Sequence, residues 1–215
     1  MQKLIQGVCH FRERTFRPLR ELFARLSEGQ HPEALCITCA DSRIDPESIT
    51  QSGPGEIFVC RNVGNLVPAY GEALGGVSAI VEYAVSALRV SHAVVCGHTD
   101  CGAMIGLLHP ERVQGLPTVQ SWLRHGEAAL SIVRRRKPSA DERSQLDELI
   151  EENVLQQMHH LRTHPSVAGA LAEGALALSG WVFDIGHGAV RIYDEERRQF
   201  LPVTSEAPAS SRATS

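Results

Sequence analysis

Two thiols and an imidazole lie directly after two short apolar runs. Cys39 follows residues 35–38, and His98 and Cys101 follow residues 93–97. Such runs predict buried strands of a parallel sheet, whose C-terminal ends meet at the edge where ligands bind. Two thiolates and one imidazole are a soft donor set that suits a tetrahedral zinc ion. Three protein ligands leave the fourth position open for water or substrate, which is typical of a catalytic zinc site.

An acid and an arginine accompany the first cysteine. Asp41 and Arg43 are two residues apart, so on an extended segment their side chains lean the same way and the guanidinium can hold the carboxylate by two hydrogen bonds. The carboxylate then stays ionised and fixed in direction. It could accept the proton of a zinc-bound hydroxide, or it could ligate the metal itself and close the site. Two thiolates cancel the two positive charges of zinc, so the metal withdraws less electron density from its bound water. The nearby positive charge of Arg43 would partly offset this loss of acidity.

These stretches and their spacing resemble the β-class carbonic anhydrases. The resemblance spans roughly residues 15 to 190, and its matching segments are 39–43, 54–58, 61–68, 80–85 and 98–102. It implies an α/β fold with a central, mainly parallel β-sheet flanked by helices, and one Zn²⁺ per chain held by Cys39, His98 and Cys101. It also implies reversible hydration of carbon dioxide to bicarbonate and a proton by zinc-bound hydroxide. Asp41 and Arg43 are the implied catalytic pair.

The resemblance assigns further positions to substrate. Gln30 corresponds to a glutamine that hydrogen-bonds substrate. Phe58, Val63 and Tyr83 fall on positions that form a small apolar pocket, although ordinary core packing is an alternative for all three. In the family, Gln30 and Phe58 are often presented by the neighbouring subunit. Gly102 would let the backbone approach a bound anion closely.

Two other positions carry narrower expectations. Some family members are regulated by bicarbonate and have a tryptophan three residues before the first cysteine ligand, where this chain has Cys36. We therefore expect the open form of the zinc site to dominate, with Asp41 away from the metal. Asp100 could relay protons or bias the charge of the site, or it could cap the helix that follows it.

The composition bounds the class of protein. A chain of 215 residues with 43% hydrophobic residues can bury one core, so we expect one domain over 1–200 and a loose tail over 201–215. The net charge of −4 argues against nucleic acid as a principal partner. The sequence shows no signal-peptide pattern and no apolar run of membrane-spanning length. We expect a cytoplasmic protein, and association with a carboxysome stays open.

The remaining elements follow from periodicity. We expect an N-terminal helical arm in two pieces within 1–28, which packs on the chain's own sheet or, as the resemblance implies, reaches across the partner of a homodimer or a multiple of dimers. Asp45 and Pro46 predict a short helical turn. Further strands are expected at 56–60, 180–185 and 189–193, and further helices at 72–88, 117–136, 141–162 and from Cys101 onward.

Two other functions compete with the anhydrase. A hydrolase of carbonyl sulfide or carbon disulfide resembles this family down to the zinc ligands and attacks a similar linear molecule. A non-catalytic assembly protein of the same fold is the other alternative. Asp41, Arg43, Gln30 and Gly102 argue against it, because a scaffold has no need of a pair that orients hydroxide.

Overall fold

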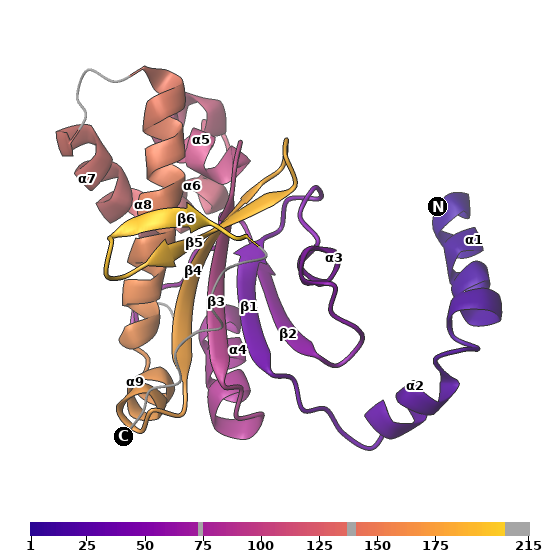
Figure 1. Ribbon diagram of the computed structural model, residues 1–215. Coiled ribbons are helices and arrows are strands. Elements are labelled where there is room, and N and C mark those ends of the chain that lie inside the picture. Colours follow the sequence, from indigo (N-terminus) through magenta and orange to yellow (C-terminus); the bar gives the residue numbers. More distant parts are fainter. Residues whose placement is uncertain (73–74, 137–140, 205–215) are drawn as a thin grey trace.

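The centre of the molecule is a six-stranded sheet in the order β2-β1-β3-β4-β5-β6 (Figure 1). The computed structural model describes residues 1–72, 75–136 and 141–204. The strands are β1 (Ala34–Cys39), β2 (Ile57–Asn62), β3 (His92–His98), β4 (Ala177–Asp184), β5 (Ala189–Asp194) and β6 (Gln199–Pro202). Strands β2, β1, β3 and β4 pair in parallel, and β5 and β6 add antiparallel pairs. The mainly parallel sheet confirms the expected fold class.

Among the described residues, two helices precede β1 and the rest connect the parallel strands. The helices are α1 (Gln2–His10), α2 (Arg20–Leu26), α3 (Pro46–Thr50), α4 (Gly76–Glu82), α5 (Gly102–Leu108), α6 (Pro117–Leu123), α7 (Glu127–Arg136), α8 (Glu142–Arg162) and α9 (Pro165–Ala172). Short π-helical and 3₁₀ turns adjoin some of them, at Phe11–Thr15, Tyr83–Ala87, Pro110–Val113 and Arg124–Gly126. Within the described ranges, none of these helices has the length and apolar character needed to cross a membrane.

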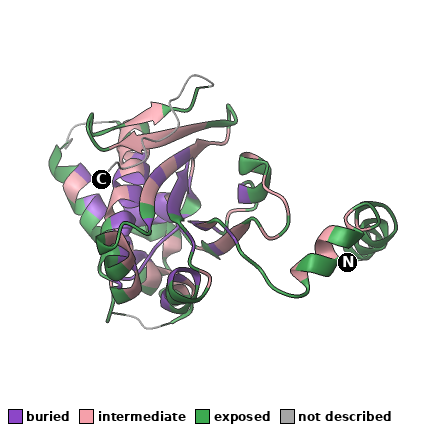
Figure 2. Cartoon of the chain, turned by 60° about the horizontal axis from the view of Figure 1, so that its bottom comes forward, coloured by how far each residue is buried: buried purple, intermediate pink, exposed green. Residues whose placement is uncertain are grey.

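The core lies on one face of the sheet. Alternate β1 side chains, Leu35 and Ile37, are fully buried there against apolar side chains of the helices, including Leu149 and Val154 of α8. Figure 2 shows the buried residues concentrated in this layer. The two-residue period of a strand therefore directs one set of side chains to the helices and the other set to the opposite face.

Two glycines let α8 lie close to the sheet. A Cβ atom on Gly97 of β3 would lie 2.8 Å from Val154 Cγ2, and one on Gly180 of β4 would lie 2.7 Å from Met158 Sδ and 2.8 Å from Val154 Cγ1. Real Cβ atoms do not approach other atoms so closely, so a larger residue at either position would force these α8 side chains, or the helix itself, to shift. The close contact fixes α8, which carries several residues toward the site described below.

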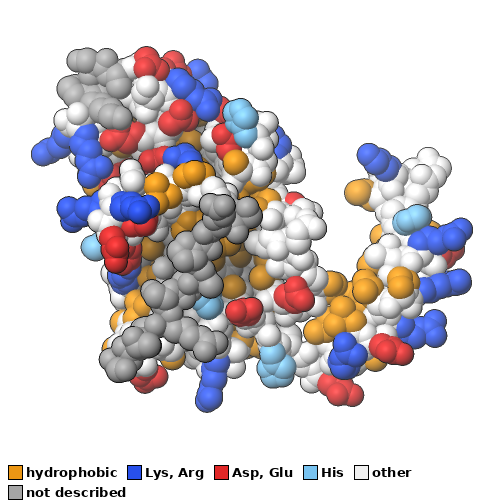
Figure 3. All heavy atoms as spheres, in the orientation of Figure 1, with side chains coloured by type: hydrophobic (Ala, Val, Ile, Leu, Met, Phe, Trp, Pro, Cys, Tyr) orange, Lys and Arg blue, Asp and Glu red, His pale blue; other side chains and the backbone are white. Residues whose placement is uncertain are grey.

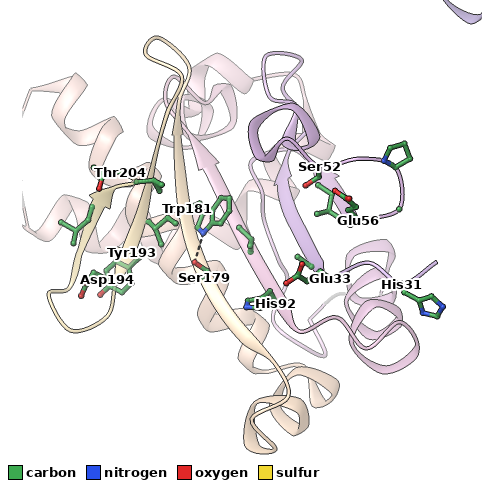
Figure 4. Close-up of a pocket in the computed structure, with 18 of the residues that line it drawn as sticks. His31, Glu33, Ser52, Glu56, His92, Ser179, Trp181, Tyr193, Asp194 and Thr204 are labelled. Carbon is green, nitrogen blue, oxygen red and sulfur yellow. Dashed lines mark hydrogen bonds between the residues drawn. The ribbon is translucent and has the colours of Figure 1, made fainter. Parts of the chain in front are cut away.

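The opposite face of the sheet is open. Cys36, Val94 and Cys96 form a small buried cluster there, with Trp181 packed against it. A hollow of about 1480 Å³ lies over this face. Figure 4 shows Trp181 on the side of the hollow, its indole Nε1 donating a hydrogen bond of 2.8 Å to Ser179 Oγ. Within the part of the chain that the structure describes, the helices therefore cover only one side of the sheet.

The N-terminal arm projects away from this body (Figures 1 and 2). Neither α1, the π-helical turn after it, nor α2 contains a buried residue. Apolar side chains of α1 are exposed, with Leu4 at 68% and Val8 at 68%. The predicted arm in two helical pieces is confirmed, and the apolar side chains of α1 are not covered by the chain's own sheet.

Several boundaries differ from expectation. The helix expected over 117–136 is interrupted by the turn Arg124–Gly126, where a Cβ on Gly126 would lie 2.8 Å from Leu107 Cδ2. The helix expected over 72–88 begins, in the described part, at Gly76. Helix α9 and strand β6 were not expected. Strand β6 includes residues 201 and 202, so the tail cannot begin at 201, and 205–215 lie outside the described residues.

Candidate active site and metal centre

The three predicted metal ligands converge. Cys39 is the last residue of β1, His98 is the last residue of the neighbouring β3, and Cys101 directly precedes α5. Their ligand atoms all lie within 4.8 Å of one another, and all three residues are buried. Because β1 and β3 run in parallel, their C-terminal ends bring these side chains to the same edge of the sheet.

The imidazole of His98 has one nitrogen with a partner and one without. Nδ1 lies 2.9 Å from the backbone oxygen of Thr99, so it donates its proton there and leaves the lone pair on Nε2. Among the described residues, the buried Nε2 atom has no hydrogen-bond partner. A buried polar atom without a partner is costly, and a metal ion would satisfy it. The donor set therefore fits zinc.

The two sulfur atoms titrate as a pair. The Cys101 thiol donates a hydrogen bond that lowers the pKa of Cys39, and Cys39 Sγ also accepts from the backbone N–H of Gly64 at 3.4 Å. The same thiol–thiolate bond, together with burial, raises the pKa of Cys101. Two sulfurs here share one proton, and a divalent cation in its place would stabilise both as thiolates.

Asp41 is held by Arg43 on both carboxylate oxygens. Arg43 Nε donates to Oδ1 at 2.9 Å and Nη2 donates to Oδ2 at 2.7 Å. These bonds hold the pKa of Asp41 well below its usual range. Oδ2 lies 4.0 Å from His98 Nε2, the nitrogen that faces the sulfur atoms. The predicted acid–arginine pair thus lies beside the three ligands, with the carboxylate ionised.

A second arginine shapes the backbone at the end of β1. Arg61 donates to the backbone oxygens of Cys39 at 3.1 Å, Asp41 at 2.7 Å and Ile44 at 2.8 Å. It therefore fixes the turn that carries Asp41 and Arg43. Its role was not assigned from the sequence, although it stands in one of the segments that resemble the family.

Helix α8 holds the loop that follows β2. Asn153 Nδ2 donates to the backbone oxygen of Gly64 at 3.2 Å, and Gln157 Oε1 accepts from the backbone N–H of Val67 at 2.8 Å. The two amides are bonded to each other at 2.9 Å, and both are buried. This network orients the N–H group of Gly64 toward the Cys39 sulfur. Neither amide could be found from spacing, because both lie about ninety residues away along the chain.

The predicted substrate residues do not all meet in one chain. Val63 follows β2 directly, at the metal edge, and its backbone oxygen accepts a bond of 2.8 Å from Trp122 Nε1. Phe58 lies near the other end of β2, four residues or about 13 Å from Asn62, which is paired with Cys39.

Two further substrate residues also lie toward that far end. The ring of Tyr83 is 6.0 Å from the ring of Phe58. Gln30 precedes β1, so the strand's length of about 16 Å separates it from Cys39. Of the four predicted side chains, the structure therefore brings only Val63 to the chain's own metal edge.

Gly102 is the first residue of α5. A Cβ atom there would meet nothing within 4 Å, so local packing does not demand a glycine. The open space beside it leaves the backbone accessible next to Cys101.

Asp100 does not cap α5. The cap residue is Cys101, without a side-chain hydrogen bond, so the capping interpretation is wrong. The carboxylate of Asp100 instead accepts from Arg143 Nη1 at 2.5 Å, and its backbone oxygen accepts from Arg43 Nη2 at 3.1 Å. No sequence pattern pointed to Arg143, which lies on α8.

A buried Cys₂His cluster, which leaves a fourth zinc position without a protein ligand, and an adjacent ionised carboxylate define a metal-dependent enzyme that acts on a small molecule. The family model described as carbonic anhydrase matches residues 34–190. A carbonic anhydrase of Synechococcus elongatus is 46% identical over 191 residues, which make up 88% of this chain and 70% of that protein. The chain belongs to the β-class carbonic anhydrases, zinc lyases that reversibly hydrate carbon dioxide.

Solved structures agree with this assignment. The β-carbonic anhydrase CcaA superposes with a TM-score of 0.92 at 44% identity, covering 94% of this chain and 99% of that one. One of two β-carbonic anhydrases described as tetrameric, from Sordaria macrospora, superposes with a TM-score of 0.77 at 31% identity, covering 89% of this chain and 95% of that one.

Proposed function

We propose that the chain forms one carbonic anhydrase domain, over the expected residues 1–200 and on to the end of β6 at Pro202, which holds one zinc ion through Cys39, His98 and Cys101. The observation that carries the proposal is the buried Nε2 atom of His98, which has no partner among the described residues and faces two sulfurs that share a proton. Zinc, when bound, supplies the Lewis acidity that makes water a nucleophile near neutral pH.

Asp41 and Arg43 do the orienting work at this site. The Asp41 carboxylate is acceptor-only, because its pKa lies well below neutrality, so it accepts a hydrogen bond from the attacking water and fixes the direction of its lone pair. Arg43 holds both carboxylate oxygens and keeps the carboxylate from turning toward the metal position. The intact pair supports the expectation that the open form of the site dominates.

The substrate pocket is assembled from two chains. Val63 lines it from the chain that supplies the metal ligands, and Gly102 leaves room for the backbone to approach the product anion. Gln30, Phe58 and Tyr83 come from a neighbouring subunit, because in their own chain they lie toward the opposite end of the strands. Carbon dioxide is apolar and linear, so apolar walls and one amide suffice to bind it.

The functional unit is a homodimer or a multiple of dimers. Support comes from the projecting arm, from the hollow of about 1480 Å³ over the open sheet face, and from tetrameric relatives. The arm carries exposed arginines, visible in Figure 3, and acidic side chains line the hollow. The arginines are Arg12, Arg14, Arg17 and Arg20, and the acids are Glu33, Glu56, Asp194 and Glu196, while Arg25 and Arg197 also line the hollow. An arm of one subunit therefore complements the open face of another in both charge and hydrophobicity.

We further propose a cytoplasmic location, with a carboxysome as a compartment within it and no nucleic-acid partner. All six cysteines are free, as expected in a reducing compartment. The relative from Synechococcus elongatus supports the carboxysome, and the net charge of −4 supports the absence of a nucleic-acid partner.

Stopped-flow measurement of carbon dioxide hydration by metal-analysed protein tests the function. We expect about one zinc per chain and fast hydration that Asp41→Asn removes. Carbonyl sulfide and carbon disulfide are assayed in parallel. Zinc-loaded protein that hydrolyses these substrates and leaves carbon dioxide untouched would contradict the proposal.

A further inference from the structure

Arg43, the more exposed residue of the catalytic pair, donates a hydrogen bond to a backbone oxygen. Arg43 is 48% exposed, so packing alone does not fix its guanidinium. Its Nη2 atom donates to Asp41 Oδ2 at 2.7 Å and to the backbone oxygen of Asp100 at 3.1 Å. The direction of that backbone oxygen therefore helps to fix Nη2, and through Nη2 the position of Asp41 Oδ2, while the backbone N–H and Nε of Arg43 hold Oδ1.

The backbone of Asp100 has an uncommon conformation. Its φ angle is +55°, in the left-handed region that non-glycine residues rarely adopt, although Asp and Asn do so more readily than others. This conformation turns the carbonyl of Asp100 toward Arg43. A contact that holds the side chain of Asp100 also helps to keep its backbone in this strained geometry.

Arg143 supplies that contact. Its Nη1 atom lies 2.5 Å from Asp100 Oδ1, and its Nε atom donates to Asp147 Oδ2 at 3.1 Å, one turn further along α8. The first turn of α8 thus presents a guanidinium held between two carboxylates. Because α8 lies tightly on Gly97 and Gly180, the guanidinium is attached to a rigid support.

We propose that Arg143 is a positioning residue for the reaction: by pairing with Asp100 it keeps the backbone oxygen of Asp100 against Arg43, and so keeps Arg43 on Asp41. The chain of contacts runs Arg143, Asp100, Arg43, Asp41 without a gap. The proposal rests on the function proposed above for Asp41 and Arg43. It adds a residue that belongs neither to the metal ligands nor to the substrate pocket.

The test compares variants of the zinc-loaded enzyme. Arg143→Gln breaks the pair, Arg143→Lys keeps the charge but loses the two-pronged geometry, and Asp100→Asn removes the charge while tolerating the left-handed backbone. Arg162→Gln is the matched control, because Arg162 is an exposed α8 arginine that pairs with Glu195 at 3.3 Å, away from the site. Each variant is measured for kcat, melting temperature and zinc content, and Arg143→Gln and Arg162→Gln are crystallised.

An exposed ion pair contributes modestly, so we expect Arg143→Gln to lower kcat about two- to fivefold, with partial recovery in Arg143→Lys. Asp100→Asn should lower kcat similarly, and adding Arg143→Gln to it should cause no further loss. In the crystal of Arg143→Gln, the bond from Arg43 Nη2 to the oxygen of residue 100 should be lengthened or broken. Arg162→Gln should match wild type in every measurement.

Two results would overturn the proposal. One is a kcat of Arg143→Gln equal to that of Arg162→Gln. The other is a lower kcat with the contacts of Arg43 unchanged in the crystal, because Arg143 would then act by another route. Failure of the wild-type enzyme to hydrate carbon dioxide would instead contradict the proposed function, and the crystal comparison would still decide whether Arg143 positions Arg43.

Discussion

Arg43 donates three hydrogen bonds to Asp41. Its backbone N–H and Nε both donate to Oδ1 at 2.9 Å, and Nη2 donates to Oδ2 at 2.7 Å. A carboxylate with both oxygens engaged keeps one orientation and one charge state across the neutral range. The second carboxylate oxygen lies 4.0 Å from the imidazole nitrogen at the metal site, close enough to act on a molecule bound there.

Asp41→Asn should lower kcat for carbon dioxide hydration by about a hundredfold or more, the usual contribution of a positioned proton acceptor. Asparagine presents an amide N–H₂ in place of one carboxylate oxygen, so it loses both the charge and an acceptor. Zinc content, measured by metal analysis, should be unchanged. A variant with wild-type kcat and full zinc would remove Asp41 from the mechanism.

Cys39→Ser should release zinc, because the thiolate that is most easily formed at the site is lost. We expect zinc content well below one per chain and a lower melting temperature. Cys36→Ala is the matched control: this cysteine lies three residues earlier in the same strand, on the open face, and should keep its zinc. Equal zinc content in the two variants would mean that Cys39 is not a ligand.

Subunit complementation tests the composite pocket. Gln30→Ala and Asp41→Asn should each be nearly inactive alone, yet their co-expression should restore about a quarter of wild-type activity, since half of the dimers are mixed and each mixed dimer has one intact site. Co-expression of Asp41→Asn with Arg43→Gln is the control, because both changes affect the same half-site. Recovery no greater than in this control would place Gln30 in its own chain's site.

The buried thiols on the open face of the sheet predict that the folded state loses stability at alkaline pH. Burial raises the pKa of both Cys36 and Cys96 to about 12, whereas in the unfolded chain they ionise at about pH 8.5. The folded state therefore binds more protons between these values, and its stability should fall as the pH rises from about 9 toward 12. Melting temperatures across this range measure the effect, and the double variant Cys36→Ala/Cys96→Ala should show a shallower fall.

The activity should rise from about pH 7 to about pH 9, because two thiolates cancel the charge of zinc and leave its water less acidic than an all-imidazole site would. Asp41 stays ionised throughout this range, so it contributes no step to the profile. Stopped-flow rates at constant ionic strength provide the measurement. A rate that fell steadily over the same interval would contradict the charge argument.

The sequence predicted those features that depend on local pattern. Apolar runs located β1 and β3, and residue chemistry located Cys39, His98 and Cys101 at their ends. The short elements were missed: α9 is built of small residues behind a proline, and β6 has four residues and ends in Pro202, so neither shows a clear period.

The contacts that position the site depend on tertiary structure instead. Asp100 was a candidate helix cap because it lies next to the start of α5, but its carboxylate forms an ion pair with Arg143 instead. The amide network of Asn153 and Gln157 likewise joins segments about ninety residues apart. No spacing rule signals such pairs, because they arise only when α8 packs on the sheet.

Gly97 and Gly180 have no side chain, so α8 packs directly against the backbone of β3 and β4 at these two positions. At Gly180, one methyl group would lie 2.7 Å from Met158 Sδ and 2.8 Å from Val154 Cγ1. The Met158 and Val154 side chains would have to shift, and wherever they could not, α8 would rise from the sheet and move Arg143 away from Asp100 and Asn153 away from Gly64. Two glycines that do not contact the catalytic groups thus affect their alignment, because they determine how closely α8 packs on the sheet.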